Sequence, residues 1–106
     1  MVSRRVCPCL TCTIYMLARY RFKMEYEREE DGSYSGSILG FDVVANAPSV
    51  DKLMVKLAED LTEYAQEYEA DFELYSRTPN RAPHFPFILR ILIQPDLDHV
   101  VDLIDA

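Results

Sequence analysis

The chain has 106 residues, of which 49% are hydrophobic and 27% are charged, and its formal net charge is −7. This length fits one domain with a modest core, and no apolar run approaches the roughly 18 residues that a membrane-spanning helix needs. Residues 24–106 hold 6 basic and 18 acidic residues, so this part alone has a net charge of 6 − 18 = −12. It repels nucleic acid at long range and attracts a basic protein.

The first 16 residues differ from the rest of the chain. They show no clear periodicity, so residues 1–16 are expected to be a disordered or mis-assigned tail, with Met16 as the alternative start, and residues 17–106 a single domain. An odd number of cysteines clustered in this tail is a poor disulfide framework, which favours a reducing cytoplasm. The cysteines are Cys7, Cys9 and Cys12.

The cysteine spacing also invites a zinc-site interpretation, because thiolates two or three positions apart can converge on one ion. The fourth ligand would have to be His84 or His99, far along the chain, and no second cysteine pair exists. We therefore expect no metal site and no cofactor.

Alternation of apolar and charged residues from Arg19 to Glu27 predicts a half-buried strand. Asp31-Gly32 is typical of a tight hairpin turn, so a second strand, Tyr34 to Leu39, is expected to pair antiparallel with the first. Phe41 to Ala47 predicts a short third strand. The core-facing residues of the first strand are expected to be Tyr20, Phe22, Met24 and Tyr26.

Residues Ser49 to Ser76 predict one long helix. Ser49 can cap the first turn, Asp51 suits the positive end of the helix dipole, and no glycine or proline interrupts the run. At 1.5 Å per residue the helix would span roughly 40 Å and cross the whole domain. Its apolar stripe, at steps of three and four, is Val50, Leu53, Leu57, Leu61, Tyr64, Tyr68, Phe72 and Tyr75.

The chain after this helix begins with a proline-rich loop, residues 76–84. Phe85 to Ile93 is apolar except for Arg90, and both a buried helix and a buried strand fit such a run. Pro86 suits a first helical turn, and Pro95-Asp96 begins a last amphipathic helix. That helix would bury Leu97, Val100, Val101 and Ile104 on one side.

These elements predict the α+β class. An antiparallel three-stranded meander is crossed by one long helix in the order β-β-β-α, and a pair of short C-terminal helices follows. The alternative is a fourth strand, Phe87 to Ile93, and one helix. Because the apolar run from Phe85 to Ile93 exceeds what one helix face can hide, a homodimer is expected.

Four stretches carry a family resemblance. They are the alternating strand Tyr20–Tyr26, the acidic turn Glu29–Tyr34, the connector Leu39–Ala45 with the serine-capped acidic helix after it, and the tail Tyr75–Phe87. The segment from Tyr20 to Tyr68 resembles the HicB-like antitoxins of prokaryotic type II toxin–antitoxin systems. The tail looks like a divergent antitoxin group that is sometimes labelled RelB-type.

The resemblance implies a non-catalytic cytoplasmic protein that binds a small basic ribonuclease toxin and occludes it, and that contacts operator DNA through the complex. A surface of one charge sign speeds encounter with a partner of the opposite sign. The alternative is that the acidic residues on the exposed side of the helix have no binding role and only keep the helix solvated. The expected partner-binding residues are Glu59, Asp60, Glu63, Glu67 and Asp71.

A second hypothesis is a nucleic-acid-binding or regulatory module without a toxin partner. It would use the segment from Arg77 to Arg90, because arginine and asparagine contact phosphates and base edges. Its candidate contacts, to nucleic acid or to a protein partner, are Arg77, Asn80, Arg81 and His84.

An enzyme is not expected. His84 and His99 lie in separate segments, and the chain has no glycine-rich phosphate loop. Asp31 and Asp42 flank the second strand like a metal-dependent nuclease pair, but the turn already accounts for Asp31.

Overall fold

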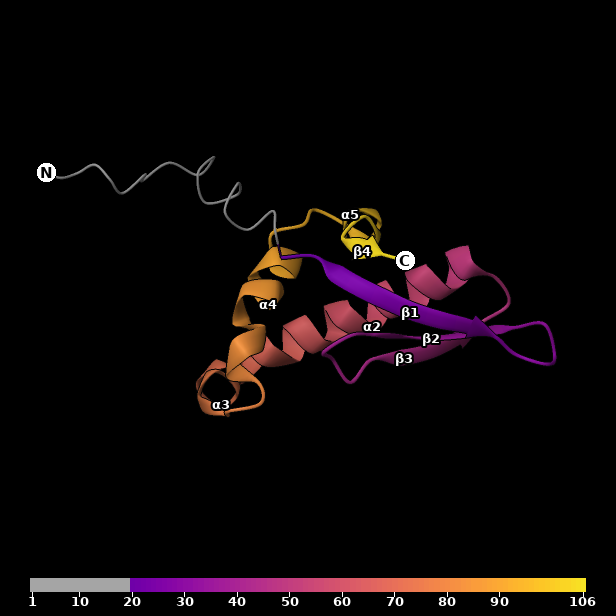
Figure 1. The fold of residues 1–106 in the computed structure, drawn as a ribbon. Helices are drawn as coiled ribbons and strands as arrows, with labels where there is room; N and C mark the ends of the chain where they lie inside the picture. The colour runs from indigo at the N-terminus through magenta and orange to yellow at the C-terminus, as the bar shows by residue number, and fades with distance from the viewer. Residues whose placement is uncertain (1–19) are drawn as a thin grey trace, which may run out of the picture.

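The computed structural model describes residues 20–106, and a four-stranded sheet forms its frame (Figure 1). The strand order is β3-β2-β1-β4, with the first three strands antiparallel and β4 parallel to β1. The predicted meander is therefore present, but the predicted count of three strands is wrong. The strands are β1 (Phe22–Arg28), β2 (Tyr34–Ile38), β3 (Val44–Ala47) and β4 (Ile104–Asp105).

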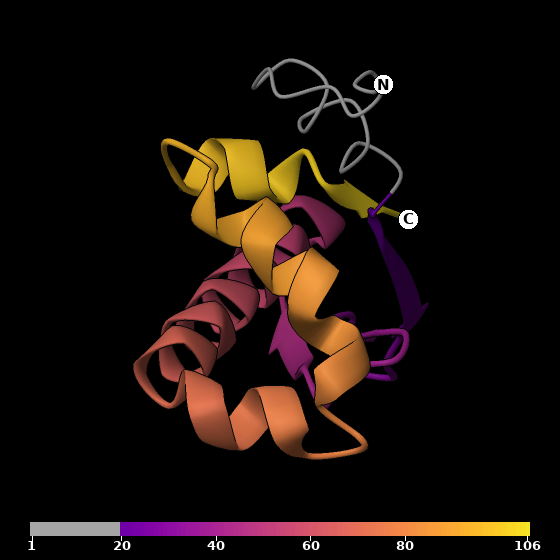
Figure 2. The same cartoon turned by 90° about the vertical axis from the view of Figure 1, so that its left-hand side faces the viewer.

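The helices complete the predicted α+β class. Figure 2 shows α4 crossing in front of α2, with α3 near one end of α2 and α5 near the other. The helices are α2 (Val50–Ala70), α3 (Phe72–Arg77), the short 3-10 helix η1 (Ala82–His84), α4 (Phe85–Leu92) and α5 (Leu97–Val101).

The single helix predicted from Ser49 to Ser76 is in fact two helices. Ser49 caps the first as expected, because its hydroxyl oxygen accepts a first-turn N–H at 3.2 Å. The backbone leaves the helical region at Asp71, with φ −123° and ψ 44°. The chain then turns so that Tyr75 packs on Tyr68 with ring centroids 5.4 Å apart. Aspartate is a weak helix former, so a break in the helix at this position costs little. The packing of Tyr75 on Tyr68 therefore prevails over the periodic pattern that predicted one continuous helix.

The third strand is shorter than the predicted span of Phe41 to Ala47. Phe41 donates its N–H to the carbonyl of Ile38 at 3.2 Å, which closes a turn. β3 therefore begins only at Val44, and Val43 is buried just before it.

The C-terminal apolar run is helical from Phe85 to Leu92, as favoured, so the alternative strand from Phe87 to Ile93 is wrong. Asp96 caps α5, because its carboxylate accepts the N–H of His99 at 3.0 Å. α5 ends at Val101, and Ile104, predicted to be helical, lies in β4 instead.

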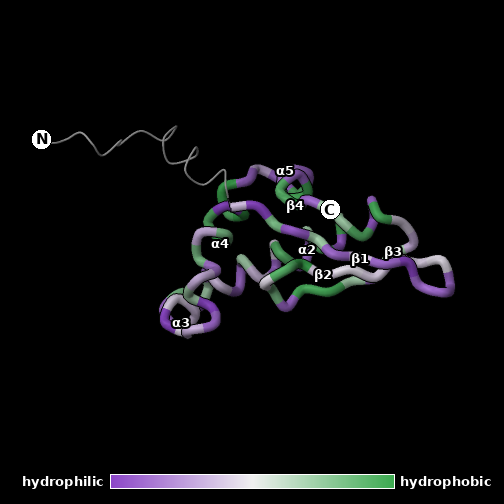
Figure 3. The backbone as a smooth tube through the Cα atoms, viewed as in Figure 1, coloured by the Kyte–Doolittle hydropathy of each residue, from purple (hydrophilic) through white to green (hydrophobic). Residues whose placement is uncertain are grey.

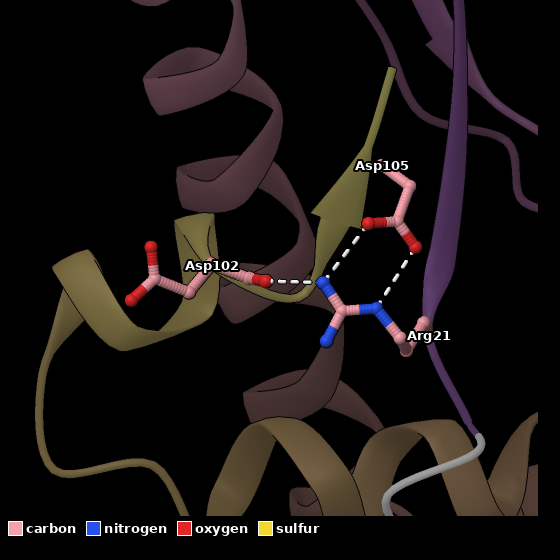
Figure 4. Close-up of polar contacts among 3 residues, drawn as sticks. All are labelled: Arg21, Asp102 and Asp105. Atoms are coloured by element: carbon pink, nitrogen blue, oxygen red, sulfur yellow. Dashed lines mark hydrogen bonds and ion pairs between the residues drawn. The ribbon is translucent and has the colours of Figure 1, made fainter.

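Arg21 holds β4 beside β1. Its guanidinium donates to both carboxylate oxygens of Asp105, at 2.8 and 2.9 Å, and to the backbone carbonyl of Asp102 at 2.6 Å (Figure 4). This paired hydrogen bond holds the pKa of the Asp105 carboxyl below its ordinary value. The N–H of Phe22 also donates to the Leu103 carbonyl at 2.9 Å. The seam between β1 and β4 is therefore joined by side-chain and by backbone hydrogen bonds.

The core lies between one face of the sheet and α2. Phe22 and Met24 are buried on the sheet side, and Leu57, Leu61 and Tyr68 are buried on the helix side, as predicted. Hydrophobic stretches in α4 contrast with the hydrophilic turn between β1 and β2 (Figure 3).

Gly36 lets α2 approach β2 closely. A Cβ atom at this position would lie 2.8 Å from Cδ2 of Leu53 and 3.0 Å from the carbonyl oxygen of Glu25. A side chain does not fit there, so the glycine fixes the spacing between helix and sheet.

Two predicted core residues lie elsewhere. Tyr26 is 45% exposed, and its ring packs edge-on against Tyr34 at a centroid distance of 6.2 Å. Tyr20 is half-buried and packs edge-on against Phe87 of α4 at 5.2 Å.

The predicted hairpin turn at Asp31-Gly32 is present between β1 and β2. The Glu29 N–H donates to the Ser33 carbonyl at 2.7 Å, which closes the turn. Within this turn only Gly32 has a positive φ, at 90°. The carboxylate of Asp31 accepts the N–H and the hydroxyl of Ser33 at 2.9 and 2.6 Å.

Replacing Leu61 by alanine tests this core. The side chain is fully buried, so its truncation should lower the free energy of unfolding by about 2–5 kcal/mol. Urea denaturation followed by circular dichroism measures the change. Val55→Ala is the control, because Val55 on the same helix is 39% exposed and should lose less than about 1 kcal/mol. Equal stability of the two variants would contradict the packing of α2.

Candidate functional site

A groove of about 680 Å³ lies between one side of α2, the turn between β2 and β3, and the segment from α3 to η1. Its size is that of a typical ligand site. Carboxylates, aromatic rings and a few basic or amide side chains line it. The lining residues are Gly40, Phe41, Asp42, Val43, Val44, Asp60, Glu63, Tyr64, Glu67, Tyr75, Asn80, Arg81 and His84.

Four carboxylates border this groove. Asp60, Glu63 and Glu67 follow one another at steps of three and four, so they project from one side of α2. Asp42 comes from the turn between β2 and β3. Within residues 20–106 none of the four carboxylates forms a hydrogen bond or an ion pair. Four carboxylates against the single guanidinium of Arg81 give the groove a net negative charge.

The guanidinium of Arg81 lies against two tyrosine rings of the groove. Its central carbon is 5.2 Å from the centroid of Tyr64 and 5.4 Å from that of Tyr75, which is cation–π geometry. A hydrogen-bonding interaction with Tyr64 raises the pKa of Arg81 above its ordinary value. The rings of Tyr64 and Tyr75 thus already bind one planar cation.

His84 joins three segments at the base of the groove. One ring nitrogen, Nε2, lies 2.9 Å from the carbonyl oxygen of Gly40, and the other, Nδ1, lies 2.7 Å from the hydroxyl of Tyr64. A carbonyl only accepts, so Nε2 carries the proton and Nδ1 accepts from the tyrosine hydroxyl. Phe41 stacks on the imidazole at 4.2 Å. This junction fixes α2, η1 and the β2–β3 turn relative to one another.

The junction favours neutral histidine. Burial lowers the pKa of His84 below its ordinary value, and the nearby Arg81 cation acts in the same direction. The hydrogen bond to Gly40 and the charge of Asp42 oppose the shift but do not reverse it.

The predicted acidic residues do not all lie in one place. Asp60, Glu63 and Glu67 line the groove, whereas exposed Glu59 does not. Asp71 borders a separate hollow of about 590 Å³ beside α3.

The second predicted set converges on the same groove. Asn80, Arg81 and His84 line it, and Arg77 instead borders the hollow beside Asp71. The structure therefore brings residues from two separately predicted sets into one site.

Sequence reasoning assigned several lining residues to no functional site, among them Phe41, Asp42 and Tyr75. Tyr75 was placed in the helix stripe, and the bend at Asp71 redirects it. Asp42 was considered only with Asp31, but the two lie in turns at opposite ends of β2. No periodicity marks a turn residue, so only the tertiary fold could reveal it.

Residues 20–106 hold no group of three histidine, cysteine, aspartate or glutamate side chains placed to bind a metal ion. His99 pairs with Asp96, with Nδ1 and Oδ1 2.6 Å apart, away from His84. Cys7, Cys9 and Cys12 lie outside the described residues. In the same described range no helix has the length and apolar character to cross a membrane.

Comparisons with known proteins identify the family. A PHD-like family model, described as the antitoxin of a RelE/RelB toxin–antitoxin system, matches residues 11–106. The chain belongs to this antitoxin family. No curated protein matches it. A crystal structure of the antitoxin part of a proposed toxin–antitoxin system from Syntrophomonas wolfei subsp. wolfei is 40% identical. The match has a TM-score of 0.84 and covers 91% of this chain and 69% of that one.

The family assignment refines the expectation from sequence. The predicted antitoxin class is confirmed, and the matching model is of the RelE/RelB type. The HicB-like designation is not the one that the comparisons support.

The two histidines of the antitoxin should give opposite pH dependences of stability. Because the pKa of His84 is lowered in the folded state, this residue contributes to the free energy of unfolding above about pH 6.5. That contribution is lost as pH falls through the folded-state pKa. Asp96 raises the pKa of His99, so that contribution is present below about pH 6.5 and is lost as pH rises through the folded-state pKa.

Urea denaturation between pH 5 and 8 tests this prediction. His84→Gln should reduce the loss of stability on acidification, and His99→Gln should increase it. The aspartates with lowered pKa values, Asp31, Asp96 and Asp105, titrate below this window and serve as a common background. Parallel pH profiles for both variants and the parent would contradict the assigned protonation states.

Proposed function

We propose that this antitoxin neutralises a basic ribonuclease toxin by binding it through the acidic side of α2 and the adjoining groove, so that the toxin's RNA-binding surface is occluded. The antitoxin itself performs no catalysis. Its homodimeric state and any contact with operator DNA through the complex remain expectations from the sequence.

One observation carries this proposal: four carboxylates border the groove and none is paired within the described chain. A ribonuclease must hold a polyanion on a positive surface, and an acidic protein surface competes for that same positive charge. The charge of −12 over residues 24–106 extends the attraction beyond the groove.

The geometry does not favour nucleic acid as the direct ligand. Arg81 is held against two tyrosine rings beside carboxylates, and His84 is kept neutral. A phosphate that approached these residues would also meet the negative charges of Asp42, Glu63 and Glu67, which line the same groove.

Charge reversal on α2 tests the proposal. Glu59, Glu63 and Glu67 are exposed, so changing all three to lysine should leave the fold intact. Association with the proposed toxin partner should slow by about 10-fold to 1,000-fold at low salt and become less salt-dependent. Surface plasmon resonance at several salt concentrations measures the rates.

The matched control reverses Glu25, Glu27 and Glu30 to lysine. These residues are also exposed and change the net charge equally, but they lie on β1 and its turn, outside the groove. The control should slow association much less. Equal effects of the two triple variants would mean that only overall charge matters. Coexpression with the toxin provides a second test. If the α2 variant protects cells as well as the parent does, the proposed site is refuted.

A further inference from the structure

β3 forms an open edge of the sheet. The N–H of Ile38 donates to the carbonyl of Val43 at 3.1 Å, so Val43 directs its backbone groups toward β2. Backbone direction alternates along a strand, so the N–H and C=O groups of Val44 and Asn46 point away from the sheet. Val44 is also 72% exposed, more than any other large hydrophobic side chain in residues 20–106.

Only part of this edge is covered. The ammonium group of Lys56 donates to the Asn46 carbonyl at 3.0 Å. The N–H and C=O of Val44 and the N–H of Asn46 have no partner in the described chain. A lysine at a sheet edge discourages pairing with another strand, so Lys56 blocks the end of β3 near Asn46. The end of β3 at Val44 stays open to an added strand.

That open end borders the acidic groove. Val44 lines the groove together with Asp42, Asp60 and Glu63. A strand added to the edge would direct every second side chain toward α2, because side chains alternate between the two faces of a sheet. Basic side chains at those alternate positions would therefore reach the carboxylates.

We propose that the edge of β3 accepts an extended basic segment of the partner protein, which adds a strand to the sheet and places alternate basic side chains in the groove. Charge complementarity selects this occupant over a second copy of the chain, whose own edge would bring another set of groove carboxylates close to the first. The inference rests on the proposed function for the view that the partner is a toxin.

A peptide tests the edge without the toxin. The probe is a fluorescently labelled, end-blocked hexapeptide of alternating arginine and valine. Its control has the same side chains but carries N-methyl groups on the alternate amides that would donate to β3. Fluorescence anisotropy should show at least about 10-fold weaker binding of the methylated peptide, because methylation removes the strand hydrogen bonds and keeps the charge. Equal affinity of the two peptides would overturn the proposal.

Two variants test the same edge from the antitoxin. Val44→Pro removes an outward N–H, and proline is tolerated on edge strands. Val44→Thr keeps the N–H and the preference for strand structure. The proline variant should bind the unmethylated peptide at least about 10-fold more weakly than the threonine variant. Thermal melts establish that both are folded.

If Val44→Pro does not fold, hydrogen exchange of the unaltered protein tests whether the peptide pairs with the edge of β3. Saturation with the unmethylated peptide should slow exchange of the Val44 amide at least about 10-fold. Exchange as fast as in the free protein would overturn the proposal.

Measurements with the toxin separate this inference from the proposed function. If toxin binding is lost on reversal of Glu59, Glu63 and Glu67 but is equal in Val44→Pro and Val44→Thr, the proposed function stands and the edge proposal fails. If the unaltered antitoxin binds the peptide with the expected preference but binds no toxin, the edge proposal stands and the proposed function fails.

Discussion

Burial of the apolar side of α2 against the sheet is the contact on which the other features of the molecule depend. Leu53 lies over Gly36, where no side chain fits, and Leu57 and Leu61 are fully buried beyond it. Because the helix has a fixed period, seating these leucines also determines which residues face outward. Asp60 and Glu63 border the groove for that reason, so core packing and surface charge are set by one rotation of the helix.

The groove persists because its walls are tied together, although they come from distant parts of the chain. Tyr64, His84 and Gly40 form a continuous hydrogen-bonded junction, and the hydroxyl of Tyr68 donates to the Arg81 carbonyl at 3.1 Å. A cation and four carboxylates are thereby held near one another without direct pairing. Such preorganisation lowers the cost of ordering the site when a partner binds.

Periodicity and capping signals were enough to predict the first two strands and the start of α2, whereas the run from Phe85 to Ile93 fitted both a helix and a strand. They could not predict the break at Asp71, which no glycine or proline marks, or β4, because two residues have no period. The acidic and the basic candidates were therefore assigned to separate functions. Their convergence depends on the reversal of the chain after Asp71, which is a tertiary effect.

The seam between β1 and β4 determines when this fold can form during protein synthesis. Arg21 and Phe22 are translated more than 80 positions before their partners at Asp105 and Leu103. Until then one side of β1 is unpaired. The β1–β4 pair therefore cannot form until these partners are translated, so a nascent chain halted before residue 103 exposes an edge of β1 that β4 covers in the structure.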